Sequence, residues 1–372
     1  MNQNPNINYT TAHYTYDARK ANLTAEAVGV VRGEKHFPVF ADGRIFKPLT
    51  KSKPFSTPLF AYAEVFWSTV INAYFEPAPV YQLAFCDGYE KGTGKYYDYG
   101  TAVPLVNGGG EYLLNLLEFF RKYPDDRVDI DQYVNYCEMF YDFTDIFSSA
   151  YFQQHTDIAE VLAMQVLVSI LKGDQNYHYE NVAFLCRENK EGSGEGCGEE
   201  IIGLAPMIDH EFSTYYQFPD HYVQHKHAFD ELLRSIGGAE VTDGEYAFVT
   251  DAKERVLVEA SAVALHHNLV YIKEHYKEVT KCFLDKLSDF AYDLQHHREW
   301  FELQKNPSYP DKASSFAFHI GMARYKEKDE QKAAEYEKAY AGKEKTIDFS
   351  VVNSQALYEI GQIIRKLNAV LQ

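Results

Sequence analysis

Apolar and polar residues alternate in short runs over roughly the first hundred positions, as is typical of strands. Turn residues separate these runs, among them Asp42 and Gly43, a pair that favours a hairpin. One segment differs, because its apolar side chains from Phe60 to Ile71 follow the spacing of a helix, which Pro58 can start. The strand-like runs are 27–31, 36–40, 44–47, 80–86 and 95–103. This pattern predicts a small antiparallel sheet with one main helix.

Helical spacing dominates the chain after Gly110. The most apolar segment, 158–171, is hydrophobic on every face, which predicts a central buried helix. The runs 181–186 and 201–208 interrupt this pattern as a hairpin whose tip is rich in Gly and Glu. The other predicted helices are 111–122, 130–147, 229–236, 251–276, 278–304, 313–341 and 354–371. We therefore predict an α+β fold with a flexible N-terminal arm over 1–24, a sheet-and-helix part over 25–106 and a larger helical part over 107–372.

Composition and charge restrict the classes of function. The chain has 372 residues, of which 46% are hydrophobic, so it is long enough to bury a large core. Its 36 basic and 54 acidic residues give a net charge of −18, which argues against direct contact with nucleic acid. The longest apolar stretch, 161–171, is too short to cross a bilayer, and five cysteines without a Cys-x-x-Cys pair fit a reducing compartment. We expect a cytoplasmic protein without a membrane span.

Two segments of the helical part carry the most specific pattern. They are 173–185, GDQNYHYENVAFL, and 204–209, LAPMID. Upstream, Lys47 lies in a predicted strand, Glu64 in the predicted helix that follows, and another strand begins near Val80. Together these segments resemble the HipA-like serine/threonine kinases, including the CtkA-type kinases. The resemblance implies a bilobal protein-kinase-like fold, with a small N-lobe, a mostly helical C-lobe, and ATP and Mg²⁺ as cofactors.

The residues implied by this resemblance suit phosphoryl transfer, which needs positioning and charge neutralisation more than covalent chemistry. A lysine on a strand, here Lys47, can hold phosphates if a helix carboxylate, here Glu64, orients it. Asn181 and Asp209 flank the predicted hairpin, whose antiparallel strands bring them together as oxygen ligands for Mg²⁺. Taken singly, Lys47 is equally typical of a surface lysine and Glu64 of a solvated glutamate. Asn181 and Asp209 are also typical of a turn residue and a helix cap.

The predicted catalytic loop departs from the family's pattern. The family has an aspartate five residues before the metal-binding asparagine, and here that position is Asn176, whose amide cannot accept a proton as a carboxylate does. A two-residue insertion before His178 would give the role to Asp174 instead, and we favour this register. The alternatives that remain open are a pseudokinase that serves as an interaction module, adenylyl transfer on a kinase-like fold, and a lipid or small-molecule kinase.

Weaker patterns complete the set of candidates. Gly29 and Gly33 flank a turn that can offer backbone N–H groups to phosphate, although paired glycines are more often simple turn residues. Glu211 can face the metal but more often such a residue pairs locally, and the pair His221 and His225 is read as a surface cluster rather than a zinc site. The expected acceptors are Ser or Thr hydroxyls of a protein substrate or of the chain itself, and the resemblance permits an antitoxin-like protein partner.

Overall fold

The computed structural model describes most of both predicted parts of the chain. The described residues are 4–15, 22–23, 37–38, 42–50, 58–87, 96–107, 110–130, 140–174, 177–188, 199–208, 210, 229–230, 232–238, 252–310, 312–314, 331, 334–335, 338 and 346–372.

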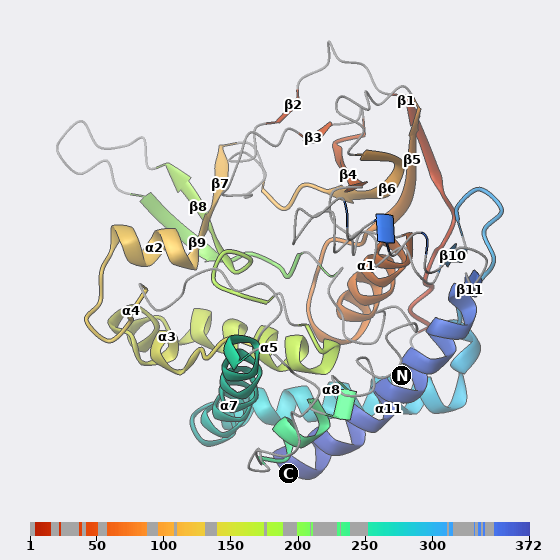
Figure 1. Ribbon diagram of the computed structural model, residues 1–372. Coiled ribbons are helices and arrows are strands. Elements are labelled where there is room, and N and C mark those ends of the chain that lie inside the picture. Colours follow the sequence, from red (N-terminus) through yellow and green to blue (C-terminus); the bar gives the residue numbers. More distant parts are fainter. Residues whose placement is uncertain are drawn as a thin grey trace.

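These residues form a mixed α+β fold with a small sheet at the N-terminal side and a mostly helical remainder, which confirms the predicted fold class (Figure 1). The strands are β1 (Ala12–Thr15), β2 (Asn22–Leu23), β3 (Phe37–Pro38), β4 (Arg44–Thr50), β5 (Gln82–Asp87), β6 (Tyr96–Pro104), β7 (Glu111–Asn115), β8 (Ala183–Glu188), β9 (Glu199–Leu204), β10 (Lys312–Ser314) and β11 (Thr346–Asp348). The helices are α1 (Pro58–Val70), η2 (Ile71–Phe75), α2 (Leu116–Lys122), α3 (Thr144–Ser148), α4 (Ala150–Gln154), α5 (Thr156–Lys172), α7 (Ala252–His275), α8 (Lys277–His296), η5 (Arg298–Trp300) and α11 (Phe349–Leu371).

The main sheet has the strand order β1-β5-β6-β4. Its three predicted strands pair antiparallel, β4 with β6 and β5 with β6. The predicted N-terminal arm contributes the fourth strand, because β1 pairs parallel with β5 and sets Ala12 opposite Ala84. In Figure 1, α1 lies between this sheet and the helices in the lower part of the molecule.

Helix α1 joins the two parts of the fold. It begins at Pro58, as predicted, and buries every side chain from Leu59 to Val70. The π-helix η2 continues it directly and contacts α5 and α8 of the helical part. There the Tyr74 hydroxyl donates to Asp293 at 2.8 Å, which secures the end of the α1–η2 segment against α8. The sheet-facing helix is therefore fixed in the helical part.

The region 111–122, predicted as one helix, is a strand followed by a helix. β7 pairs with β8, and β8 pairs with β9, so the predicted hairpin belongs to a three-stranded sheet. Asn115 ends β7, and its side chain accepts from the backbone N–H of Glu118 at 2.8 Å as the N-cap of α2. The helix therefore starts at Leu116, since Asn at an N-cap favours a start immediately after it.

Helix α5 is the centre of the helical part, as its apolar sequence predicts. It contacts α4, α7, α8 and α11 and buries nearly all of its residues from Ile158 to Lys172. Two later predictions differ in extent, because α8 ends at His296 instead of near residue 304 and α11 begins at Phe349.

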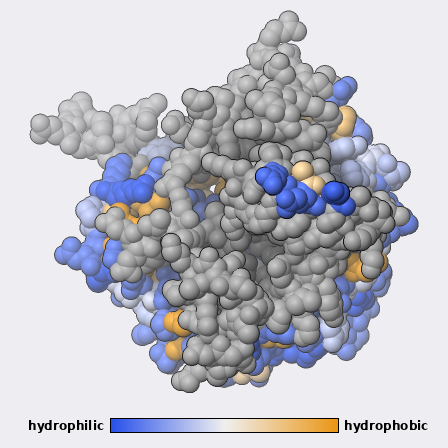
Figure 2. Space-filling model, in the orientation of Figure 1, coloured by the Kyte–Doolittle hydropathy of each residue, from blue (hydrophilic) through white to orange (hydrophobic). Residues whose placement is uncertain are grey.

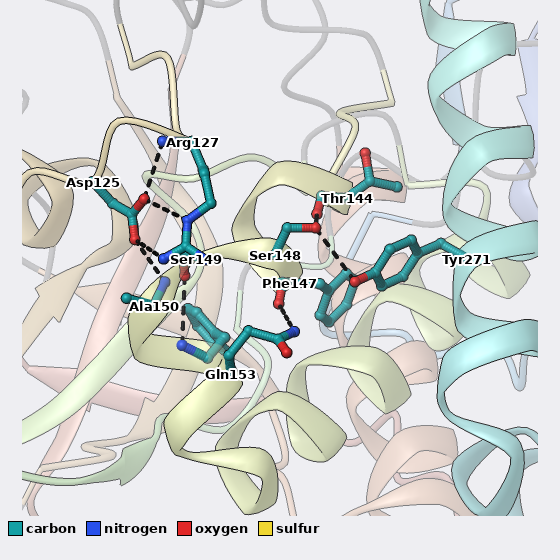
Figure 3. A network of polar contacts seen from close by, with 10 residues as sticks. Asp125, Arg127, Thr144, Phe147, Ser148, Ser149, Ala150, Gln153 and Tyr271 are labelled. Carbon is teal, nitrogen blue, oxygen red and sulfur yellow. Dashed lines mark hydrogen bonds and ion pairs between the residues drawn. The ribbon is translucent and has the colours of Figure 1, made fainter.

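A turn-and-cap network holds the short helices α3 and α4 beside α5. The Asp125 carboxylate accepts from Arg127 Nε at 2.9 Å and from the backbone N–H of Ala150 at 2.6 Å (Figure 3). The Arg127 hydrogen bonds hold the pKa of Asp125 down at about 2, so this carboxylate is ionised at neutral pH. On the other side of Figure 3, Ser148 lies 3.4 Å from the Tyr271 hydroxyl of α7.

On the face shown in Figure 2, most of the described surface is hydrophilic, with small apolar patches between. Among the described residues, the helices are all too short or too polar to span a bilayer.

Candidate functional site

The predicted lysine and glutamate meet at the face of the main sheet. Lys47 of β4 forms an ion pair with Glu64 Oε1 of α1. Thr101 of β6, which lies opposite Lys47 in the β-ladder, donates its hydroxyl to Glu64 Oε2 at 2.7 Å. The Glu64 side chain is 2% exposed and that of Lys47 is 24% exposed. Both oxygens of the Glu64 carboxylate therefore have a partner, while part of the Lys47 side chain reaches the surface.

A second charged cluster lies where α5 ends. Gly173 adopts a left-handed conformation, with φ +60°, and the N–H of Asp174 returns to the carbonyl of Ser169 at 2.9 Å. This closing turn is the usual end of a helix that stops at glycine. It brings the Asp174 carboxylate to 2.6 Å from the Lys172 ammonium, and the two side chains are 2% and 0% exposed.

His210 completes this second cluster from the segment after β9. Lys172 Nζ lies 2.9 Å from His210 Nδ1, and because an ammonium only donates, Nδ1 accepts and the imidazole proton lies on Nε2. Burial, then the charges of Lys172 and of Lys47, hold the pKa of His210 well below its usual value. His210 is therefore neutral, and its ring centroid lies 5.6 Å from that of Tyr81, the residue just before β5 of the main sheet.

The loop after α5 is attached to the helical core by two tyrosines. Tyr177 and Tyr179 are both buried, and their hydroxyls donate to Gln165 and to the Asp142 carbonyl, respectively. The residues between and after them, His178 and Asn181, remain partly exposed. Because buried and partly exposed residues alternate along this loop, the two tyrosines face the core and the predicted site residues stay on the other side of the loop.

Asn181 lies just before β8, on the edge from which the chain leaves β9. The backbone N–H of Ala205 donates to the Ala183 carbonyl at 2.8 Å, so the first residue of β8 is paired with the residue that follows β9. The metal prediction also requires Asp209 to lie near Asn181, and this part stays a prediction. Asp209 itself, with Asn176, Gly29, Gly33 and Glu211, lies outside the described residues. The described part of the chain holds no cluster of three or more His, Cys, Asp or Glu side chains arranged around a metal position.

The structure therefore brings Lys47 to Glu64 and places Asp174 beside Lys172, in a buried position. Asp174 is almost completely buried, so its carboxylate faces partners inside the fold rather than the surface. In this arrangement Asp174 is suited to hold the loop rather than to accept a proton. The sequence alone did not point to Lys172, His210 and Thr101, since their roles depend on contacts between distant segments. Only the apolar surroundings of Lys172 in the sequence are unusual for a lysine.

What the site can do follows from its charges. A partly exposed ammonium on a strand, oriented by a buried carboxylate, can bind an anionic group such as a phosphate. The loop after α5 separately offers the imidazole of His178 and the amide of Asn181, both partly exposed, as hydrogen-bonding groups. The Lys47 ammonium itself is thus suited to bind a polyanion.

Comparison with solved structures finds a distant structural likeness. The chain is similar to a solved structure of the proinflammatory kinase CtkA of Helicobacter pylori, with a TM-score of 0.35, 10% sequence identity, and coverage of 91% of this chain and 99% of that chain. No family model matches the chain, and no curated protein sequence matches it.

Proposed function

We propose that this chain is a kinase-like phosphotransferase that binds ATP with Mg²⁺ and transfers the terminal phosphoryl group to a Ser or Thr hydroxyl. The observation that carries the proposal is the Lys47–Glu64 ion pair, which Thr101 supports by a hydrogen bond to the second carboxylate oxygen. His210, which directly follows the predicted metal ligand Asp209 in the sequence, packs against Tyr81 beside the N-terminal sheet.

In this proposal Lys47 binds the phosphates, and Glu64 keeps the ammonium directed at them. Asn181 and Asp209 hold Mg²⁺ through an amide and a carboxylate oxygen, ligands that this hard cation prefers. The cation supplies the charge neutralisation that phosphoryl transfer needs. Gly29 and Gly33 are proposed to offer backbone N–H groups to the same phosphates.

Asp174 acts in the proposal as the residue that fixes the start of the loop through Lys172. The acceptor hydroxyl then lies near Asn176 and His178, which orient it by hydrogen bonds. Phosphoryl transfer tolerates this arrangement, because its transition state is largely dissociative and depends chiefly on alignment. The bond between the γ-phosphorus and the bridging oxygen breaks, ADP leaves, and the hydroxyl proton passes to an oxygen of the transferred phosphoryl group.

One observation favours a second candidate, a nucleotide-binding protein that transfers no phosphoryl group. The Asp174 carboxylate is buried and paired with Lys172, so it is poorly placed to assist an acceptor hydroxyl. Adenylyl transfer is the related case in which the nucleotide binds but AMP is the group transferred.

The test measures thermal unfolding of the full chain with Mg-ATP, together with intact mass and ADP release. A nucleotide that binds the folded chain stabilises it by about 2.7 kcal/mol at a concentration 100-fold above Kd. We expect a clear upward shift in Tm for the natural chain, together with a phosphoryl mass gain or ADP release. Lys47→Met should reduce the Tm shift and abolish phosphoryl transfer. Lys281→Met, which removes an exposed lysine of α8, is the matched control and should keep both.

The outcomes separate the candidates. No Tm shift at millimolar Mg-ATP would rule out the nucleotide site. A shift without ADP release or mass gain would favour the nucleotide-binding protein, and a gain of AMP would favour adenylyl transfer. Because Lys47→Met leaves a buried carboxylate, Lys47→Met with Glu64→Gln is measured beside it, so that loss of binding is not confused with loss of fold.

A further inference from the structure

One amide on the apolar helix α5 joins three segments of the chain. Gln165 is 2% exposed. Its Nε2 donates to Glu76 Oε1 at 3.1 Å and to the Ala205 carbonyl at 3.0 Å, and its Oε1 accepts from the Tyr177 hydroxyl at 2.9 Å. Both donor hydrogens and the oxygen of this amide are therefore used, each by a different part of the fold.

Glu76 strengthens the same connection. It follows η2 directly, and besides Gln165 its Oε1 accepts from the backbone N–H of Met207 at 3.4 Å. The segment after β9 is thus held at two places, at Ala205 by Gln165 and at Met207 by Glu76. Burial raises the pKa of Glu76 to about 7, which is consistent with a carboxyl group enclosed by these partners.

The three connected segments are those that carry the proposed site. Tyr177 lies in the loop that ends at Asn181, and the segment from Ala205 leads to Asp209. Glu76 ends the continuous helix that carries Glu64. Buried polar groups that are all satisfied favour a single arrangement, because any shift would leave one of them without a partner.

We propose that Gln165 is a positioning residue: it sets the separation between the loop 177–181 and the segment 205–208, and Glu76 ties both to the helix that carries Glu64. The kinetic part of this inference rests on the proposed function. The structural part does not, since it concerns only how two segments of this chain are held.

The same helix provides a matched control. Ser169 is also a buried polar residue of α5, one turn further along, but its hydroxyl donates only to the nearby Val166 carbonyl of its own helix, at 2.8 Å. Ser169→Ala therefore removes a polar group from α5 without disconnecting any segment. Tyr177→Phe removes the bond to the loop alone, and Gln165→Leu removes all three bonds.

The experiment is amide hydrogen exchange on the full chain, read in peptides that cover 177–182 and 204–208. Tyr177→Phe should speed exchange of the first peptide by up to about tenfold and spare the second, since one buried hydrogen bond is lost. Gln165→Leu should speed exchange of both, and Ser169→Ala of neither. Unchanged exchange in Tyr177→Phe would overturn the inference, and so would equal acceleration in Ser169→Ala. Because Tyr177→Phe retains the ring, it decides the question even if Gln165→Leu does not fold.

Kinetics add a readout that a purely structural role would not move. If the natural chain transfers phosphoryl groups, Tyr177→Phe should lower kcat and leave KM for ATP nearly unchanged. Unaltered kcat in a variant with faster loop exchange would refute the positioning of the site. If the natural chain proves inactive, the proposed function fails, and the exchange data still decide whether Gln165 holds the two segments.

Discussion

Glu76→Gln should remove a pH dependence of folding stability that the buried carboxyl group creates. Burial raises the pKa of Glu76 from its ordinary value of 4.5 to about 7, against the smaller opposing effects of the Met207 and Gln165 hydrogen bonds and the charge of Lys286. The folded chain therefore binds this proton more tightly than the unfolded chain. The stabilisation is complete below pH 4.5 and is lost as the pH rises to about 7.

The magnitude follows from the two pKa values. The interval from 4.5 to about 7, at about 1.4 kcal/mol per pH unit, corresponds to about 3 kcal/mol. Gln keeps the Oε1 acceptor that Gln165 and Met207 use, but it has no charge to bury. Relative to the natural chain, the variant should gain about 3 kcal/mol in the free energy of unfolding between pH 4.5 and pH 8.

Urea unfolding at several pH values from 4.5 to 8 measures this difference. The control is Glu160→Gln, which makes the same chemical change at an exposed position of α5, where no charge is buried. A difference for Glu76→Gln that stays constant across this range would refute the reasoning. It would mean that the carboxyl group is not buried enough to resist ionisation.

Two further substitutions test the backbone and the second charged cluster. In Gly100→Ala the new Cβ would lie 2.1 Å from the Lys47 carbonyl oxygen of the paired strand. We therefore expect urea unfolding to show a loss on the order of 1–3 kcal/mol in the free energy of unfolding. Gly203→Ala, whose new Cβ would meet nothing within 4 Å, is the control and should cost little. Lys172→Met should cost about 3–5 kcal/mol, because it leaves the Asp174 carboxylate buried without its cation. Adding Asp174→Asn to Lys172→Met should restore much of that loss, and no restoration would show that the ion pair is not the cause.

The secondary structure that the sequence predicted well is the part with strong local signals. The start of α1 at Pro58 and the course of α5 follow from a proline and from a continuous apolar run, which act within one element. The strand β7 was missed because its residues pair with β8, about seventy positions away, and their own spacing is equally compatible with a helix. Only the cap at Asn115 marks the boundary locally.

The candidate site likewise contains residues that the sequence could predict and residues that it could not. Lys47 and Glu64 could be singled out, since each lies in an element whose type the sequence shows. They meet because α1 packs against β5 and β6, and β4 pairs with β6. Thr101 and His210 could not, because their roles come from strand register and from the return of a distant segment. Gln165 stood out in the sequence as a polar residue in an apolar run, but its partners depend on three separate segments.

The charges of the two clusters bear on what the proposed site requires. Lys47 is balanced by Glu64 and Lys172 by Asp174. Burial, followed by the charges of Lys172 and Lys47, lowers the pKa of His210, so that this side chain is neutral. The clusters thus provide hydrogen-bond donors and direction but little net positive charge, within a chain whose net charge is −18. A triphosphate brought into such surroundings would meet too little compensation from these side chains alone. On the proposed function, the divalent cation is therefore the main source of positive charge, and nucleotide binding should depend on it more strongly than on any one lysine.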